Sequence, residues 1–100
     1  REALIRDFLD KPIPADWAKY NLDQRRVFWG GGSHDDGQLI PRDRVCALEV
    51  WIELFGGDAK SMKYADAQEI NACIVATRGW KRAESSIRFG YCGKQKGFTK

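Results

Sequence analysis

Residues 45–57, VCALEVWIELFGG, contain the clearest helical pattern in this chain of 100 residues. Five apolar side chains recur at the spacing of one helix face: Val45, Leu48, Trp51, Ile52 and Phe55. Only Glu49 and Glu53 form a polar strip on a helix that is otherwise largely apolar. The two glycines at 56 and 57 are typical of a helix C-terminus. We therefore predict that this helix is buried on most sides and forms the centre of the core.

A second helix is predicted over residues 64–77 by the same periodicity. The inward positions are Ala67, Ile70, Cys73, Ile74 and Thr77. The outward positions are Tyr64, Gln68, Asn71, Ala72 and Val75. The period then changes from helical to alternating, which predicts one short strand from Trp80 and another from Ile87 to Tyr91, joined by a turn at residues 84–86. Helices followed by such a β-hairpin indicate a mostly helical α+β fold of winged-helix type, with a wing and a basic tail.

The N-terminal segment, residues 1–29, is predicted to be helical in parts. Apolar residues between 4 and 9 give an amphipathic helix over residues 2–10, which Pro12 and Pro14 end. Asp23 is a candidate cap for a helix through DQRRVFW. Either helix could complete the three helices of a winged-helix core.

Residues 30–40 form a glycine-rich loop. It is either the tip of a hairpin that pairs residues 27–29 with 38–40 or an insertion between helices. His34, Asp35 and Asp36 suggest a metal site, but adjacent polar residues in a glycine loop are usually solvated, so we predict no metal and no other cofactor.

The length, composition and cysteine content are those of one globular domain over residues 1–100, with 43% hydrophobic and 31% charged residues. The sequence has no apolar run that could cross a bilayer and no signal peptide, which favours a cytoplasmic protein without membrane contact. The three cysteines are widely spaced and are expected to stay reduced. Because the helical pattern begins at once after Arg1, we expect a C-terminal fragment of a longer protein.

Positive charge is concentrated at the C-terminal end. Residues 78–100 hold seven cations and one carboxylate, a formal charge of +6, whereas the other 77 residues carry −3. Aromatic residues are interleaved with these cations, a composition suited to contacting phosphates and stacking on bases. We predict that a DNA backbone is bound by Lys81, Arg82 and Arg88 of the hairpin and by Lys94, Gln95 and Lys96 of the tail.

The helix before the hairpin is a weaker candidate for groove reading. It contains Asp66 and Glu69 and no cation between residues 64 and 77, which penalises its entry into a DNA groove. Its candidate contacts are Lys63, Gln68, Asn71 and Arg78. We therefore expect weak sequence specificity, for duplex or single-stranded DNA; the charge pattern alone does not separate DNA from RNA.

Several segments together resemble the C-terminal region of the virulence-associated protein E family. They are PADW, LDQRR, VCALEVWIELFGGD, DAQEINACI, GWKR, RFG and GKQKGF, in that order. The family's tail motif, G-P-Y-G-[KR]-Q-R-G-F, appears here as GYCGKQKGF, and Lys63 stands where a Thr or Ser is expected as a helix cap. The resemblance implies a DNA-binding appendage of a phage- or island-encoded ATPase of helicase or primase type, which would use its own ATPase core as a partner.

No catalytic residues can be assigned in this chain. It has no GxxxxGK[ST] phosphate loop, one histidine, and no nucleophile with a neighbouring base, so we expect that it is not itself an enzyme. Glu49 and Glu53 lie one helical turn apart, a spacing at which carboxylates are commonly solvated or paired with arginine.

The alternative function is a protein-interaction or oligomerisation module that docks onto its own ATPase core through the face containing Tyr64 and Val75.

Overall fold

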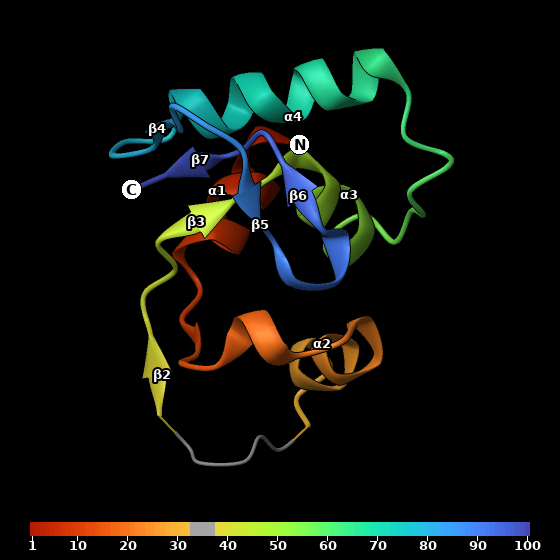
Figure 1. The fold of residues 1–100 in the computed structure, drawn as a ribbon, viewed down its shortest axis with the longest axis vertical. Coiled ribbons are helices and arrows are strands. Elements are labelled where there is room, and N and C mark those ends of the chain that lie inside the picture. Colours follow the sequence, from red (N-terminus) through yellow and green to blue (C-terminus); the bar gives the residue numbers. More distant parts are fainter. Residues whose placement is uncertain (33–37) are drawn as a thin grey trace.

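The computed structural model describes residues 1–32 and 38–100, which form four α-helices and a set of short antiparallel strands (Figure 1). The helices are α1 (Glu2–Asp10), α2 (Leu22–Trp29), α3 (Ala47–Glu53) and α4 (Tyr64–Ala76), with two 3₁₀ turns, η1 (Trp17–Lys19) and η2 (Gly90–Cys92). The strands are β1 (Ile13–Pro14), β2 (Leu39–Ile40), β3 (Arg44–Val45), β4 (Lys81–Arg82), β5 (Ile87–Arg88), β6 (Lys94–Gln95) and β7 (Phe98–Thr99). The metal hypothesis for His34, Asp35 and Asp36 falls outside the described residues.

The strands form three small sheets. β1 pairs with β2, β5 pairs with β6, and β7 lies between β3 and β4. All of these pairings are antiparallel. The last strand of the chain is therefore the central strand of the largest sheet.

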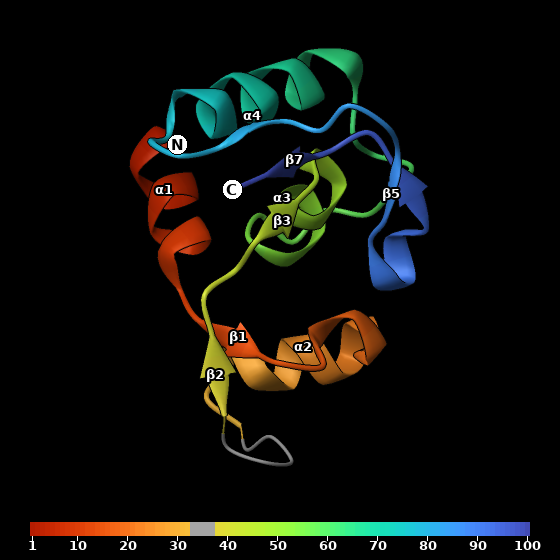
Figure 2. The same ribbon diagram turned by 60° about the vertical axis from the view of Figure 1, so that its left-hand side comes forward.

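The main core lies below α4, which packs on both α1 and α3 (Figure 2). Its buried members are Ile5, Phe8, Leu9, Val45, Ala47, Val50, Ile70, Ile74, Trp80 and Phe98. They come from α1, α3, α4, strands β3 and β7, and Trp80 just before β4, so this core joins the two ends of the sequence. The α+β class predicted from the sequence is confirmed.

A second core holds the lower part of the molecule, which contains β1, η1, α2 and β2 (Figures 1 and 2). Trp17, Phe28 and Trp29 pack edge to face, with ring centroids 5.1 to 5.4 Å apart. Trp29 also packs against the main core, so its side chain links the two parts.

Two predicted helices are confirmed. In α1, Ile5, Phe8 and Leu9 are buried, and the chain becomes extended at Lys11. In α4, Ile70 and Ile74 are buried, whereas Tyr64 and Val75 are exposed as predicted. α1 has an apolar stripe on one side only, whereas α4 buries one apolar side and also exposes apolar residues on the other.

The central helix is shorter than predicted. Val45 belongs to β3, because it pairs with Phe98 of β7, and α3 begins at Ala47. Val50 and Ile52 are buried, which confirms the position of α3 in the core. Glu49 is also buried, at 3% exposure, so Glu49 and Glu53 are not a solvated strip.

The candidate cap of α2 and one of the two alternatives for the glycine loop, the hairpin of 27–29 with 38–40, are wrong. Asn21, not Asp23, caps α2: its Oδ1 accepts from Gln24 N at 2.8 Å, and Gln24 Oε1 accepts from Asn21 N at 2.8 Å. Residues 27–29 complete α2, so they cannot pair with 38–40. Ile40 of β2 instead lies opposite Ile13 of β1.

The predicted wing between residues 80 and 91 is also wrong. β4 does not pair with β5; it pairs with β7, with Arg82 opposite Phe98. β5 forms its hairpin with β6 through η2, so the hairpin lies one strand later than expected. The C-terminal residues are not a free tail, because Phe98 is 1% exposed and Lys100 N donates to Asp43 O at 3.0 Å.

Candidate nucleic-acid interface

The cations of the C-terminal segment are exposed and have no acidic partner among the residues that the structure describes. The exposed cations of this segment are Arg78, Lys81, Arg82, Arg88, Lys94, Lys96 and Lys100. In residues 1–32 and 38–100, ion pairs involve only Arg1, Arg25, Arg42 and Arg44. The charge of the segment is therefore not neutralised by ion pairs with the described carboxylates of the body.

Three predicted contact residues line one groove of about 480 Å³, which we call the Arg82 groove. Its lining residues are Asn71, Arg82, Ala83, Glu84, Ser85, Ser86, Lys96, Gly97 and Phe98. The guanidinium of Arg82 lies 5.3 Å from the centroid of the Phe98 ring, which restrains the side chain over a buried aromatic. The groove thus holds two cations, two hydroxyls and an amide beside one carboxylate, Glu84.

A second positive site lies on the β5–β6 hairpin. Arg88 is directly opposite Lys94, and both side chains are exposed. Like charges directly opposite each other on neighbouring strands destabilise a sheet. An anion bound between them would relieve this repulsion.

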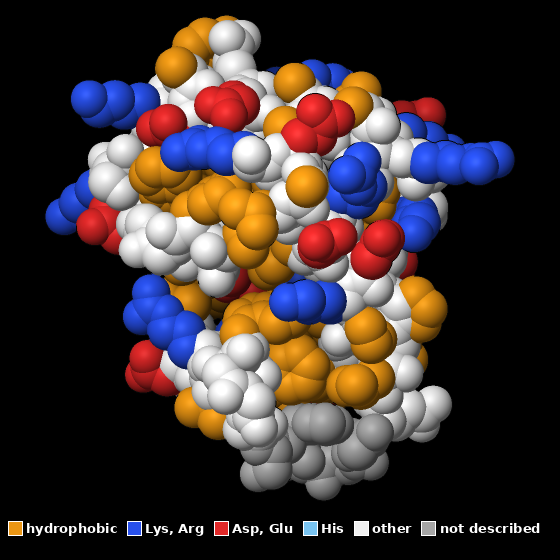
Figure 3. All heavy atoms as spheres, turned by 180° about the vertical axis from the view of Figure 1, so that it is seen from behind, with side chains coloured by type: hydrophobic (Ala, Val, Ile, Leu, Met, Phe, Trp, Pro, Cys, Tyr) orange, Lys and Arg blue, Asp and Glu red, His pale blue; other side chains and the backbone are white. Residues whose placement is uncertain are grey.

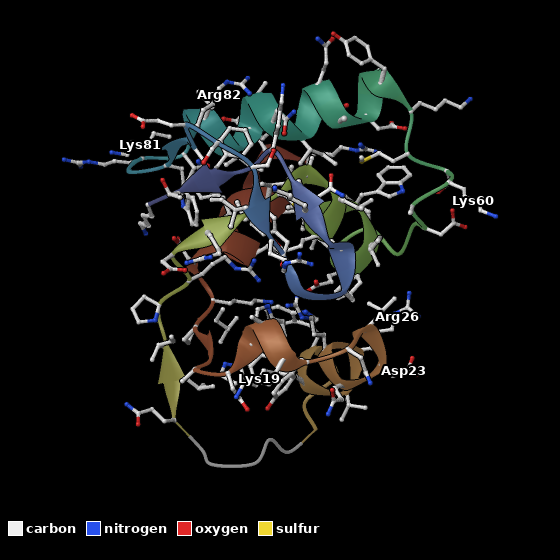
Figure 4. The ribbon with its side chains drawn as sticks, in the orientation of Figure 1. Lys19, Asp23, Arg26, Lys60, Lys81 and Arg82 are labelled. Atoms are coloured by element: carbon white, nitrogen blue, oxygen red, sulfur yellow. The ribbon has the colours of Figure 1, made fainter. Side chains whose placement is uncertain are left out.

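The side chains of Lys81 and Arg82 lie on opposite faces of the sheet, although the two residues are adjacent in sequence. Lys81 is opposite Thr99 and Arg82 is opposite Phe98, so alternation directs the two side chains to opposite faces of the sheet. Figure 4 shows both at the same end of the molecule, beside α4, with Lys60 on the far side. The sheet register therefore does not bring Lys81, Arg82 and Arg88 together in one row.

Gln95 is separated from its predicted neighbours by the same alternation. It pairs with Ile87, is half-buried, and its Nε2 donates to Cys92 O at 3.0 Å. This hydrogen bond closes the turn at η2, which gives Gln95 a role in the hairpin itself.

The predicted α4 contacts do not form one surface. Gln68 donates to Tyr64 Oη at 2.8 Å on the exposed side of α4. Lys63 and Arg78 flank opposite ends of a helix of 13 residues, about 20 Å long at 1.5 Å per residue. Asp66 accepts from Lys63 N at 3.1 Å, so this carboxylate caps the helix. Of the four residues, only Asn71 lines the Arg82 groove.

A buried charge cluster, formed by Arg25, Arg42, Glu49 and Glu53, lies between the two parts of the molecule. Arg25 Nη1 donates to Glu49 Oε2 and to Glu53 Oε2, each at 2.8 Å. Arg25 and Glu49 are 1% and 3% exposed, and the side chain of Glu53 is fully buried. The cluster joins α2 to α3 through charge-assisted hydrogen bonds.

Three further contacts complete the surroundings of Arg25 and Glu53. Glu53 Oε1 accepts from Trp29 Nε1 at 2.9 Å, and Glu53 Oε2 accepts from Tyr91 Oη at 2.7 Å. Arg25 Nη2 donates to Trp17 O at 2.9 Å, and its guanidinium lies over the rings of Trp17 and Tyr91. Glu53 therefore connects α2, α3 and η2.

Burial and charge act differently on the members of this cluster. Burial tends to lower the pKa of Arg25, but the two glutamates outweigh it and raise that pKa, so Arg25 stays charged. Burial lowers the pKa of Arg42, whose guanidinium lies 3.8 Å from Glu49 Oε1 and has no hydrogen-bond partner among the described residues. Burial also raises the pKa of Glu49. The pairing is structural, because its members are enclosed.

The face opposite to that in Figure 1 carries cations and carboxylates side by side around exposed hydrophobic groups (Figure 3). No uniform positive surface is visible there. The positive sites defined by their lining and pairing residues, the Arg82 groove and the Arg88–Lys94 pair, are therefore the better candidates for a polyanion.

No family model and no curated protein matches this chain. In the described part of the chain, no helix is long and apolar enough to cross a membrane. The same residues contain no group of three or more His, Cys, Asp or Glu side chains that could hold a metal ion.

Proposed function

We propose that this chain is a DNA-binding domain that contacts the DNA backbone with little sequence specificity. The observation that carries the proposal is the set of exposed cations at the Arg82 groove and the Arg88–Lys94 pair, which form no ion pair with any described carboxylate. Cations of this kind gain free energy by displacing the counterions condensed on a nucleic acid. Asn71, Ser85 and Ser86 supply neutral donors to the same groove.

The resemblance to the virulence-associated protein E family gives this activity a setting. We propose that the domain acts in the cytoplasm as an appendage of a phage-type helicase or primase ATPase and holds DNA against that ATPase core. The β5–β6 hairpin, connected to α4 through β4, would serve as the wing of a winged-helix-like domain. Catalysis would belong to the ATPase and not to this chain.

Fluorescence anisotropy with labelled DNA over a series of salt concentrations tests the proposal. Four phosphate contacts predict that log K falls against log [salt] with a slope of about −3.6 for duplex or about −2.8 for a single strand. Replacing Arg82, Arg88, Lys94 and Lys96 by Ala should weaken binding to all sequences and flatten that slope. Lys19→Ala with Lys60→Ala, two exposed cations outside both sites, is the matched control and should change little. Absence of binding at low salt, or an unchanged slope in the fourfold variant, would contradict the proposal.

A protein-docking role is the second candidate, because the outer side of α4 exposes large apolar groups. Tyr64 is 79% exposed and Val75 is 46% exposed. Such a face fits contact with the parent ATPase or a second copy. Sedimentation that depends on protein concentration, together with no DNA binding at low salt, would favour this role over the first.

A further inference from the structure

A pocket of about 270 Å³ lies at the boundary between the two parts of the molecule, and we call it the seam pocket. Its lining comes from β1, η1, α2, β2, β3, α3, β5 and η2, and includes Trp17, Arg25, Ile40, Glu49, Arg88 and Phe89. Pockets that enclose small organic molecules usually measure about 300–1,000 Å³. At about 270 Å³ the seam pocket lies just below this range, so it is suited to one small flat group, such as a single nucleobase.

The inner lining is largely apolar, and two unpaired donors lie buried behind it. Ile13, Pro14, Ile40 and Phe89 supply the apolar surface. Trp17 Nε1 and Arg25 Nε have no hydrogen-bond partner, and their side chains are more than nine-tenths buried. A buried donor without an acceptor is unfavourable. These two nitrogens each have less than 1 Å² of accessible surface and lie behind the lining, so the surface offered to a ligand is apolar and would fit a flat, largely apolar group.

The charges of the lining leave one free cation for the ligand. Arg25 is paired with Glu49 at 2.8 Å, and Arg44 is paired with Asp43 at 3.4 Å. Arg88, the third arginine of the pocket, has no carboxylate partner in the described part of the chain and lies opposite Lys94. The same ligand should therefore present an anion at Arg88 and an uncharged body to the interior.

We propose that the seam pocket takes one base of single-stranded DNA while the adjoining phosphate contacts Arg88 and Lys94. This inference rests on the DNA binding proposed above and names the form of DNA that the site prefers. A base in a duplex is stacked and paired, so it cannot enter a pocket without being flipped out. In a single strand, every base is free to leave the stack, and the cost of entry is small.

The test compares a short oligothymidylate with a duplex of the same length at low salt, using the whole chain. Ala15 and Ala18 line the pocket and are exposed, so Ala15→Trp and Ala18→Trp would fill it from its rim without disturbing a core. Each should weaken binding of the oligothymidylate about tenfold, the effect of losing one bound base, and leave duplex binding unchanged. Ala65→Trp, at an exposed position of α4, is the control and should alter neither.

Thermal unfolding of each variant shows whether it is folded. Two filling variants are used so that the test remains possible if one of them does not fold. Two outcomes in which the wild-type chain binds DNA would overturn the base pocket and leave backbone binding in place. In the first, the filling variants bind the oligothymidylate as tightly as the wild type does. In the second, they lose affinity for the duplex and for the single strand equally. If the wild-type chain binds neither probe, the proposed function itself is overturned.

Discussion

Two groups of cations in this small domain experience opposite environments. Arg25 is enclosed and shares its Nη1 between two carboxylates, whereas Arg88 and Lys94 are exposed, face each other and have no carboxylate partner in residues 1–32 and 38–100. A buried cation must be paired, because an uncompensated charge in the interior is very costly. An exposed cation is solvated and can remain unpaired at little cost. The difference separates charge that maintains the fold from charge that is available to a ligand.

The location of each group supports the same division. The buried charge cluster lies where α2 meets α3, and its partners Trp29 and Tyr91 come from α2 and η2. The exposed cations lie on β4, β5 and β6, in the segment that the main core holds through Trp80 and Phe98. Loss of the first group should therefore affect stability, and loss of the second should affect binding.

The largest effect is expected from Arg25→Ala. This change leaves Glu49 and Glu53 buried without their shared partner, so the free energy of unfolding should fall by about 3–5 kcal/mol. Urea denaturation measures this loss. Arg26→Ala is a matched control on the same helix, because Arg26 is exposed and its loss should cost less than about 0.5 kcal/mol. Equal losses in the two variants would show that the cluster does not hold α2 to α3.

A smaller effect is expected from Tyr91→Phe, which removes the hydroxyl that donates to Glu53 Oε2 at 2.7 Å. A hydrogen bond to a charged group contributes about 1.5–3 kcal/mol, so the free energy of unfolding should fall by an amount in that range. Tyr64→Phe, on an exposed side chain, is the control and should cost under about 0.5 kcal/mol.

The same variant should change how stability depends on alkaline pH. Burial, followed by the charge of Glu53, raises the pKa of Tyr91, so in the folded state it resists ionisation. In the unfolded chain a tyrosine ionises near pH ~10, and the wild-type protein should therefore lose stability as the pH rises beyond that value. Tyr91→Phe should show a shallower decline, by at most about 1.4 kcal/mol per pH unit, in urea titrations from neutral to alkaline pH. A decline of the same slope in both proteins would contradict the shift.

The helices were the most predictable part of the fold. In α1 the apolar residues lie on one face, and in α4 the residues at helical spacing that were expected inward include the buried Ile70 and Ile74, so the sequence indicates the extent and the buried side of both. The strands were not predictable, because each contains two residues and shows no useful alternation. Their partners depend on tertiary packing: Phe98 enters the core, and β7 consequently displaces the expected pairing of β4 with β5.

The candidate site was predictable in composition and not in arrangement. The exposure of Arg82, Arg88, Lys94 and Lys96 followed from their charge. Their grouping depends on strand register, which separates Lys81 from Arg82 and places Gln95 on the turn. For the buried cluster, the sequence offers two adjacent arginines, Arg25 and Arg26. Only their positions around the axis of α2 determine which of them is buried. One signal was present: two glutamates on a helix that is otherwise buried require a cation nearby.

The smallest effect is expected from Lys94→Ala, and its sign is opposite to that of Arg25→Ala. Removing one member of the like-charged pair with Arg88 should raise the free energy of unfolding by about 0.2–0.5 kcal/mol, since directly opposed like charges destabilise a strand pair. Added salt should reduce this gain because both side chains are exposed. The same variant should bind DNA more weakly, so a gain in stability accompanies a loss of affinity. Urea denaturation measures the stability and fluorescence anisotropy measures the affinity, both on one preparation. Lys60→Ala is the control and should change neither the free energy of unfolding nor the affinity for DNA. A loss of stability in Lys94→Ala would contradict the prediction, because it would mean that Lys94 stabilises the hairpin as Arg25 stabilises the interior.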